Sequence, residues 1–96
     1  MTTATDGSGL FVRDHTLLWR RVGGRRLVVL SPSGELRELE GSGPVLWELL
    51  AEPVAYQELV AVLGELFGEA AARIDADVAP VLAELEASGL VRRVAP

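Results

Sequence analysis

The 96-residue chain has the length and composition of one small globular domain. Its residues are 49% hydrophobic, which suits a single core and leaves too little material for two. It has no cysteine and one histidine, His15, which excludes disulfides, thiol catalysis and zinc sites of the usual nitrogen and sulfur ligands. Nine basic residues against 14 acidic ones give a net charge of −5, which disfavours nucleic acid as a partner.

Residues 1–9 are small and polar, and we expect them to form a disordered tail ahead of a single domain over residues 10–96. They lack the basic and apolar regions of a signal peptide, and no apolar run approaches the roughly 18 residues of a membrane span. We therefore expect a soluble, cytoplasmic protein with no membrane partner.

The first half of the domain is typical of strands. Residues 17–22 and 25–30 are rich in strand formers, and Gly23-Gly24 between them predicts a hairpin with a two-residue turn and Val22 opposite Arg25. In that register the apolar side chains lie together on one face, and the arginines lie close to the turn. The apolar set is Leu17, Trp19, Val28 and Leu30, and the tip set is Arg20, Arg21, Arg25 and Arg26. Residues 31–34 form a turn, and residues 35–39 are predicted to form a short edge strand.

The second half has helical spacing. Ser42 or Gly43 can cap a first helix with Pro44 in its first turn, and Gly68 is placed to end a second helix that starts near Tyr56. A third helix is predicted with Asp77 as its cap, since Pro80 then falls in the first turn. Its apolar stripe is Ile74, Val78, Val81, Leu82 and Leu85, and Gly89-Leu90 matches a Schellman ending. Residues 91–96 either add a short strand or fray. The predicted fold is α+β and winged-helix-like, a three-stranded antiparallel sheet followed by three helices.

Catalytic groups are poorly placed. His15 lies at the start of a strand and would have to leave it to activate a serine, and Asp75 and Asp77 occupy different faces of a helix start, where they suit the dipole. The segment Gly41-Ser42-Gly43 lacks the further glycine and the lysine of a phosphate loop. We expect no enzymatic activity, no cofactor and no metal.

Two surfaces have functional interpretations. The four arginines of the hairpin could contact DNA phosphates, but residues 75–88 offer only acidic charges where a recognition helix needs basic or amide side chains. Solubilising the tip and docking to an acidic partner protein both remain open. The edge strand could accept an extended peptide as a further strand, or its charges could simply protect the edge from aggregation.

The order and spacing of several motifs resemble the PqqD-like family, the RiPP recognition elements. The resemblance runs from about Leu17 to Val91. It is carried by residues 39–50 (LEGSGPVLWELL), Glu58-Leu59-Val60, Asp77-Val78, Leu82, Leu85 and Gly89-Leu90. The chain departs from the family pattern at Glu40 and at Ala51-Glu52-Pro53, which affects the assignment of a subfamily more than the fold.

The resemblance implies a function and a site. Family members bind the leader of a ribosomally made precursor peptide as an added strand, in the cleft between the third strand and third helix, and present it to a modifying enzyme or leader peptidase. Carried over to this chain, the peptide-binding residues are Glu35, Leu36, Arg37, Glu38, Leu39, Val78, Val81, Leu82 and Leu85. A small winged-helix DNA-associated regulator and a structural subunit of an enzyme complex remain as alternatives.

Overall fold

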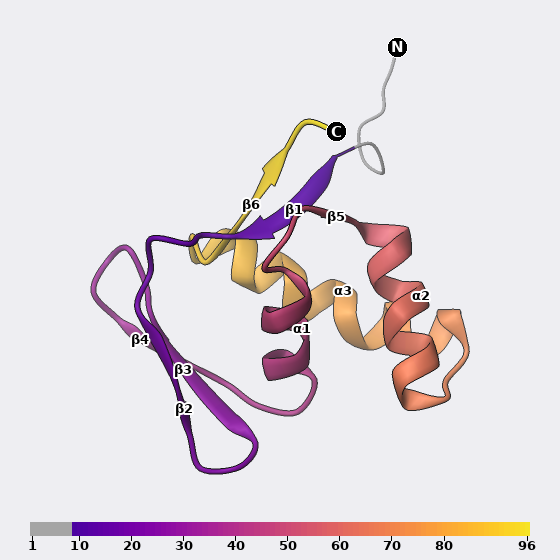
Figure 1. The fold of residues 1–96 in the computed structure, drawn as a ribbon, viewed down its shortest axis with the longest axis horizontal. Helices are drawn as coiled ribbons and strands as arrows, with labels where there is room; N and C mark the ends of the chain where they lie inside the picture. Colours follow the sequence, from indigo (N-terminus) through magenta and orange to yellow (C-terminus); the bar gives the residue numbers. More distant parts are fainter. Residues whose placement is uncertain (1–8) are drawn as a thin grey trace.

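The computed structural model describes residues 9–96 as two small antiparallel sheets and three helices (Figure 1). In spatial order, one sheet contains β2 (Trp19–Val22), β3 (Arg26–Leu30) and β4 (Leu36–Leu39), and the other contains β5 (Val54–Ala55), β1 (Leu10–Arg13) and β6 (Val91–Val94). The helices are α1 (Gly43–Leu49), α2 (Tyr56–Phe67) and α3 (Ala71–Ala87). The α+β class is confirmed.

The expectation of one sheet has to be corrected to two. The expected sheet is present ahead of the helices, but β1 and β6, at opposite ends of the described chain, pair with each other from Leu10 opposite Val94 to Arg13 opposite Val91. A strand formed by partners so distant in sequence has no local turn signal to reveal it. The winged-helix likeness stays a prediction, and the expected tail over residues 1–9 lies, except for Gly9, outside the described residues.

The hairpin between β2 and β3 forms in a different register from the one predicted. Its turn contains Gly23, Gly24 and Arg25, with φ of 71° at Gly23, so that Val22 pairs with Arg26 and Trp19 with Val29. One extra residue in the turn shifts the pairing by one position, and on β3 this exchanges the two faces. The prediction that Val28 and Leu30 share a face with Trp19 is therefore wrong, because Trp19 lies on the face of Leu27 and Val29, which are fully buried.

The buried face of this sheet packs on α1. Leu27, Val29 and Leu39 belong to one core cluster with Leu46 and Trp47 of α1. Ser42 stands at the N-cap position and Pro44 in the first turn, as predicted, although the Ser42 side chain makes no capping hydrogen bond. The sheet therefore has one face in the core and one in solvent.

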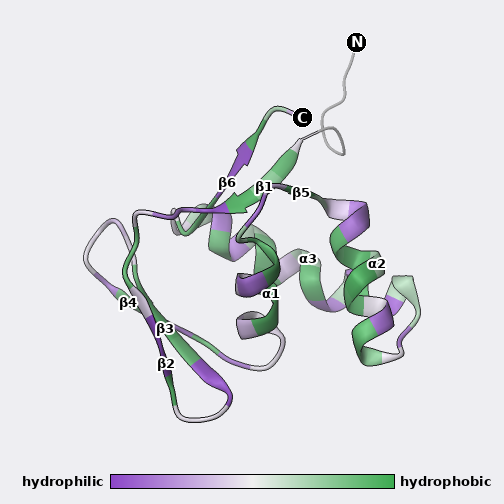
Figure 2. Ribbon diagram, in the orientation of Figure 1, coloured by the Kyte–Doolittle hydropathy of each residue, from purple (hydrophilic) through white to green (hydrophobic). Residues whose placement is uncertain are grey.

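The second sheet lies above the helices in Figure 1, beside the C-terminal end of α3. Figure 2 shows β1 as hydrophobic along most of its length, whereas β6 beside it has a hydrophilic middle, Arg92 and Arg93. Phe11 and Val12 of β1 are buried. Of the two alternatives for residues 91–96, a short strand or a frayed end, the strand is the one present. β1 was not foreseen as a strand.

Helix α3 begins earlier than predicted. It starts at Ala71 with Ala70 as its N-cap, so Asp77 is not the cap and Pro80 lies in the interior of the helix. The early start puts Ile74, which is 5% exposed, at the head of the buried stripe. Burying such a side chain stabilises the fold by about 1.5–3 kcal/mol. This gain is similar in size to the roughly 3 kcal/mol that a proline inside a helix costs, so it can offset Pro80.

The two helix endings predicted from glycine are both confirmed. Gly68 ends α2 in the left-handed conformation, with φ of 65°. At the end of α3, Leu90 N–H donates to the Leu85 carbonyl (3.0 Å) and Gly89 N–H to the Glu86 carbonyl (3.1 Å), the pair of bonds that defines a Schellman motif. This ending returns the chain toward β1, where Asp14 N–H donates to the Leu90 carbonyl at 2.9 Å.

Candidate functional site

The free edge of β4 is the first component of the site. Within residues 9–96, β4 pairs with β3 alone, so its other side is open. Ser31 N–H donates to the Glu35 carbonyl (2.8 Å), and the register then pairs Leu30 with Leu36 and Val29 with Arg37. Because hydrogen-bonded and non-hydrogen-bonded pairs alternate in an antiparallel ladder, the backbone N–H and C=O groups of Leu36 and Glu38 point toward the open side.

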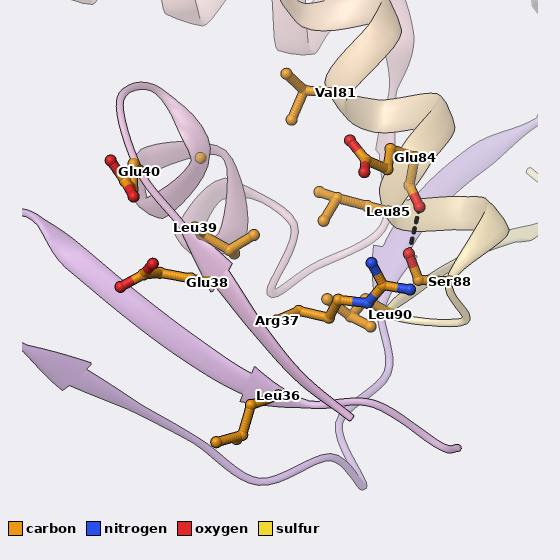
Figure 3. A pocket seen from close by; sticks show the side chains of 11 residues that line it. Leu36, Arg37, Glu38, Leu39, Glu40, Val81, Glu84, Leu85, Ser88 and Leu90 are labelled. Carbon is orange, nitrogen blue, oxygen red and sulfur yellow. Dashed lines mark hydrogen bonds between the residues drawn. The ribbon is translucent and has the colours of Figure 1, made fainter. Parts of the chain in front are cut away.

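A groove of about 380 Å³ runs between this edge and the C-terminal half of α3. Figure 3 shows β4 on one side of it and Val81, Leu85 and Ser88 projecting from α3 on the other. The lining residues are Leu36, Arg37, Glu38, Leu39, Glu40, Gly43, Val81, Glu84, Leu85, Ser88 and Leu90.

The groove has an apolar floor and an acidic rim. Leu39, Leu85 and Leu90 are buried at its base, and the adjoining Val81 is half-buried. Glu40 and Glu84 are exposed at the rim, and no ion pair involves either of them in the part of the chain that the structure describes. The groove thus suits an apolar side chain with positive charge beside it.

Arg37 is the basic side chain of the groove. It lies across the space between β4 and the end of α3, near Ser88 and Leu90 (Figure 3). A terminal guanidinium nitrogen lies 3.3 Å from the Glu35 carboxylate, but Nε is buried and has no hydrogen-bond partner among residues 9–96. Buried donors without an acceptor are uncommon and cost about 1–3 kcal/mol each.

The structure brings together six of the nine residues that the sequence suggested for peptide binding. They are Leu36, Arg37, Glu38, Leu39, Val81 and Leu85. Glu35 precedes β4 and does not line the groove, and Val78 and Leu82 are core residues, 2% and 4% exposed. Val78 reaches a different hollow beside Phe67, and Leu82 one beside Tyr56. The part that these residues play in binding stays a prediction.

Sequence reasoning missed five lining residues: Glu40, Gly43, Glu84, Ser88 and Leu90. A signal existed for two of them, because Glu84 and Ser88 follow Val81 at spacings of three and seven and so share its helix face. Gly43 approaches β4 closely, since a Cβ there would lie 3.1 Å from the Leu39 Cβ. Only the packing of α1 against β4 reveals that contact.

Over residues 9–96 there is no cluster of three or more acidic or histidine side chains able to hold a metal ion. None of the helices in that range is long and apolar enough to cross a membrane.

Comparison with known proteins places the chain in a family. A family model described as coenzyme PQQ synthesis protein D (PqqD) matches residues 26–91, well over half of the chain, from the start of β3 to the start of β6. No curated protein and no solved structure matches significantly. The matched range contains the whole groove between β4 and α3 and leaves out β1 and β2. The chain belongs to the PqqD family.

Proposed function

We propose that this protein binds the leader segment of a ribosomally made precursor peptide as an extra strand on β4 and presents it, in the cytoplasm, to a modifying enzyme or leader peptidase. The protein itself would catalyse nothing and need no cofactor. Membership of the PqqD family implies in general a peptide-binding role in PQQ-related or RiPP-related biosynthesis. The observation that carries the finer proposal is the outward backbone of Leu36 and Glu38 beside a groove with an apolar floor.

Strand addition divides the work between backbone and side chains. Hydrogen bonds to the backbone of Leu36 and Glu38 would give affinity for any extended chain, and alternate peptide side chains would enter the groove and give selectivity. The buried Leu39 and Leu85 favour aliphatic or aromatic anchors there, and Glu40 and Glu84 favour basic residues beside them. A peptide acceptor that reached Arg37 Nε would remove the cost of that unpaired donor.

The test uses Leu36→Pro, with Leu36→Ala as its matched control. The Leu36 N–H points outward and the side chain is 70% exposed, so proline removes an edge donor without breaking the β3–β4 ladder. Labelled leader peptides encoded by small reading frames beside this gene would be titrated against each protein by fluorescence anisotropy. We expect Leu36→Pro to weaken binding about tenfold or more, near 1.4 kcal/mol, and Leu36→Ala to bind within about threefold of the parent.

Circular dichroism would establish that both variants are folded. If folded Leu36→Pro bound its peptide as tightly as Leu36→Ala, strand addition on β4 would be wrong. If the parent protein bound no leader but bound the modifying enzyme tightly, the structural-subunit interpretation would replace the proposal.

A further inference from the structure

The outer face of the β2–β3–β4 sheet, on the side away from the helices, carries an exposed row of leucines. Leu30 N–H donates to the Leu18 carbonyl (2.9 Å), and Leu30 pairs with Leu36, so these three residues line up across the sheet. Leu18 and Leu36 are 72% and 70% exposed, and Leu30 is also exposed. Together they form a continuous apolar strip. A single exposed leucine is common on a protein surface, but a contiguous patch of them indicates a binding surface.

The strip is hollowed. A depression of about 210 Å³ is lined by Leu18, Trp19, Arg20, Val28, Leu30 and Leu36. It lies on the opposite side of the sheet from the core residues Leu27 and Val29. Leu36 belongs both to the groove beside β4 and to the outer face of the sheet. Its backbone faces the open edge of β4, and its side chain lies on the outer face.

Positive charge borders the strip, although the chain as a whole has a net charge of −5. Arg20 pairs with Val28 in the row beside the strip, whereas Arg25 stands farther away, in the hairpin turn. Within residues 9–96, neither Arg20 nor Arg25 forms an ion pair, whereas Arg26 lies 2.8 Å from Glu38. Both unpaired arginines are therefore available to carboxylates from outside the described chain.

We propose that this outer face, the leucine strip with Arg20 at its border and Arg25 in the hairpin turn beyond, is a docking surface for a partner protein that inserts an apolar side chain and places carboxylates toward the hairpin. An apolar centre with a charged rim is the usual anatomy of a protein interface. The identity of this partner, the modifying enzyme or leader peptidase, rests on the proposed function. That enzyme would then lie beside the peptide held on β4.

Other occupants fit the surface less well. Nucleic acid is contacted mainly through phosphates by basic and polar side chains, whereas the centre of this surface is leucine. A second copy of the chain that docked through the same face would bring no free carboxylate to it, since Glu38 of β4 is already paired with Arg26. An anionic membrane would attract the arginines but would be repelled by the acidic remainder of the chain.

The test measures affinity for the purified modifying enzyme or leader peptidase encoded beside this gene, using Leu18→Ser, Arg20→Glu and, as control, Arg92→Glu on the exposed part of β6. Leu18 and Arg20 are exposed, so neither change disturbs the core. We expect each of the two surface variants to weaken enzyme binding about tenfold or more and the control to have no effect. Added salt should slow association of the parent more than that of Arg20→Glu.

Leader affinity, measured in parallel, should stay within about twofold in all three variants. Absence of enzyme binding, or enzyme binding that neither Leu18→Ser nor Arg20→Glu weakens, would overturn the proposal. So would binding of duplex DNA or of phosphatidylserine vesicles that Arg20→Glu abolishes, or self-association that Leu18→Ser abolishes. If the enzyme binds through this face while no leader binds β4, the docking surface stands and the peptide-binding function fails.

Discussion

At the scale of single residues, Tyr56 is a titratable group whose pKa is strongly raised. It is the only tyrosine of the chain, and its hydroxyl donates a hydrogen bond to the Asp75 carboxylate, which joins the start of α2 to α3. Burial of the phenol, followed by this hydrogen bond and the Asp75 charge, raises the pKa of Tyr56 to about 12 from an ordinary value of 10.0. Each of these causes favours the neutral phenol over the tyrosinate.

This shift predicts how stability depends on alkaline pH. Because the folded pKa lies above the unfolded one, the stability linked to Tyr56 is fully present below about pH 10 and is lost as the pH rises toward about 12. The titration can be followed by tyrosinate absorbance without interference from other tyrosines. Asp75→Asn should lower the pKa of Tyr56, since it removes the charge but not the burial. An unchanged titration in Asp75→Asn would show that the carboxylate has no part in the shift.

At the scale of elements, α3 keeps its helical path through Pro80. The proline has no N–H for the carbonyl four residues earlier, at Ala76, and its ring crowds that carbonyl. Pro80 is exposed, so the distortion occurs on the solvent side of the helix while Val78 and Leu82 stay buried. The buried stripe thus decides that the segment is one helix, against the local preference of the proline.

Replacing this proline should stabilise the protein. We expect Pro80→Ala to raise the free energy of unfolding by about 1–3 kcal/mol, because it restores a hydrogen bond and removes the ring clash. Urea denaturation would measure the change. As a control on the same exposed side, Ala83→Gly should lower the free energy of unfolding by about 1 kcal/mol. A loss of stability in Pro80→Ala would mean that the packing of α3 depends on the bend at the proline.

At the scale of the whole molecule, Arg13 connects the two sheets. It belongs to β1, and its guanidinium carbon lies 5.1 Å from the ring centroid of Trp19 in β2 and 5.2 Å from that of Trp47 in α1. It also donates a hydrogen bond to the Trp47 carbonyl at 3.0 Å. The two tryptophan rings pack edge to face with their centroids 6.3 Å apart. One arginine and two aromatic rings therefore join both sheets to α1.

Removing this connection should weaken the whole fold. Arg13→Ala is expected to lower the free energy of unfolding by about 1–3 kcal/mol, since two cation–π contacts and a hydrogen bond to a charged donor are lost together. Arg92→Ala, an exposed arginine on β6, should change stability by less than about 0.5 kcal/mol. Thermal denaturation followed by circular dichroism would compare them. Equal effects of the two substitutions would contradict a linking role for Arg13.

The candidate site was predictable where local patterns define it. A short charged segment after a turn predicted the edge strand at β4, and the spacing of Val81 and Leu85 predicted that they share a helix face. The spacing did not separate Val78 and Leu82, which lie in the core, from Val81 and Leu85, which line the groove, because a helix stripe wider than one row divides its residues between core and groove. Which side of the stripe meets β4 depends on how α3 is rotated in the fold, and no local pattern records that rotation.

The sequence by itself determined the order of three helices, the glycine endings of α2 and α3, the β2–β3 hairpin and the edge strand, since spacing and turn residues act within a few positions. It misplaced the start of α3, which packing decided. Only the tertiary structure decided the second sheet, in which β1 and β6 pair from opposite ends of the described chain, and the register that placed Leu27 and Val29 in the core. Both outcomes depend on what is buried against distant residues. A one-residue change in a turn is a small local event, yet it exchanges the faces of a strand, and only the packed core distinguishes them.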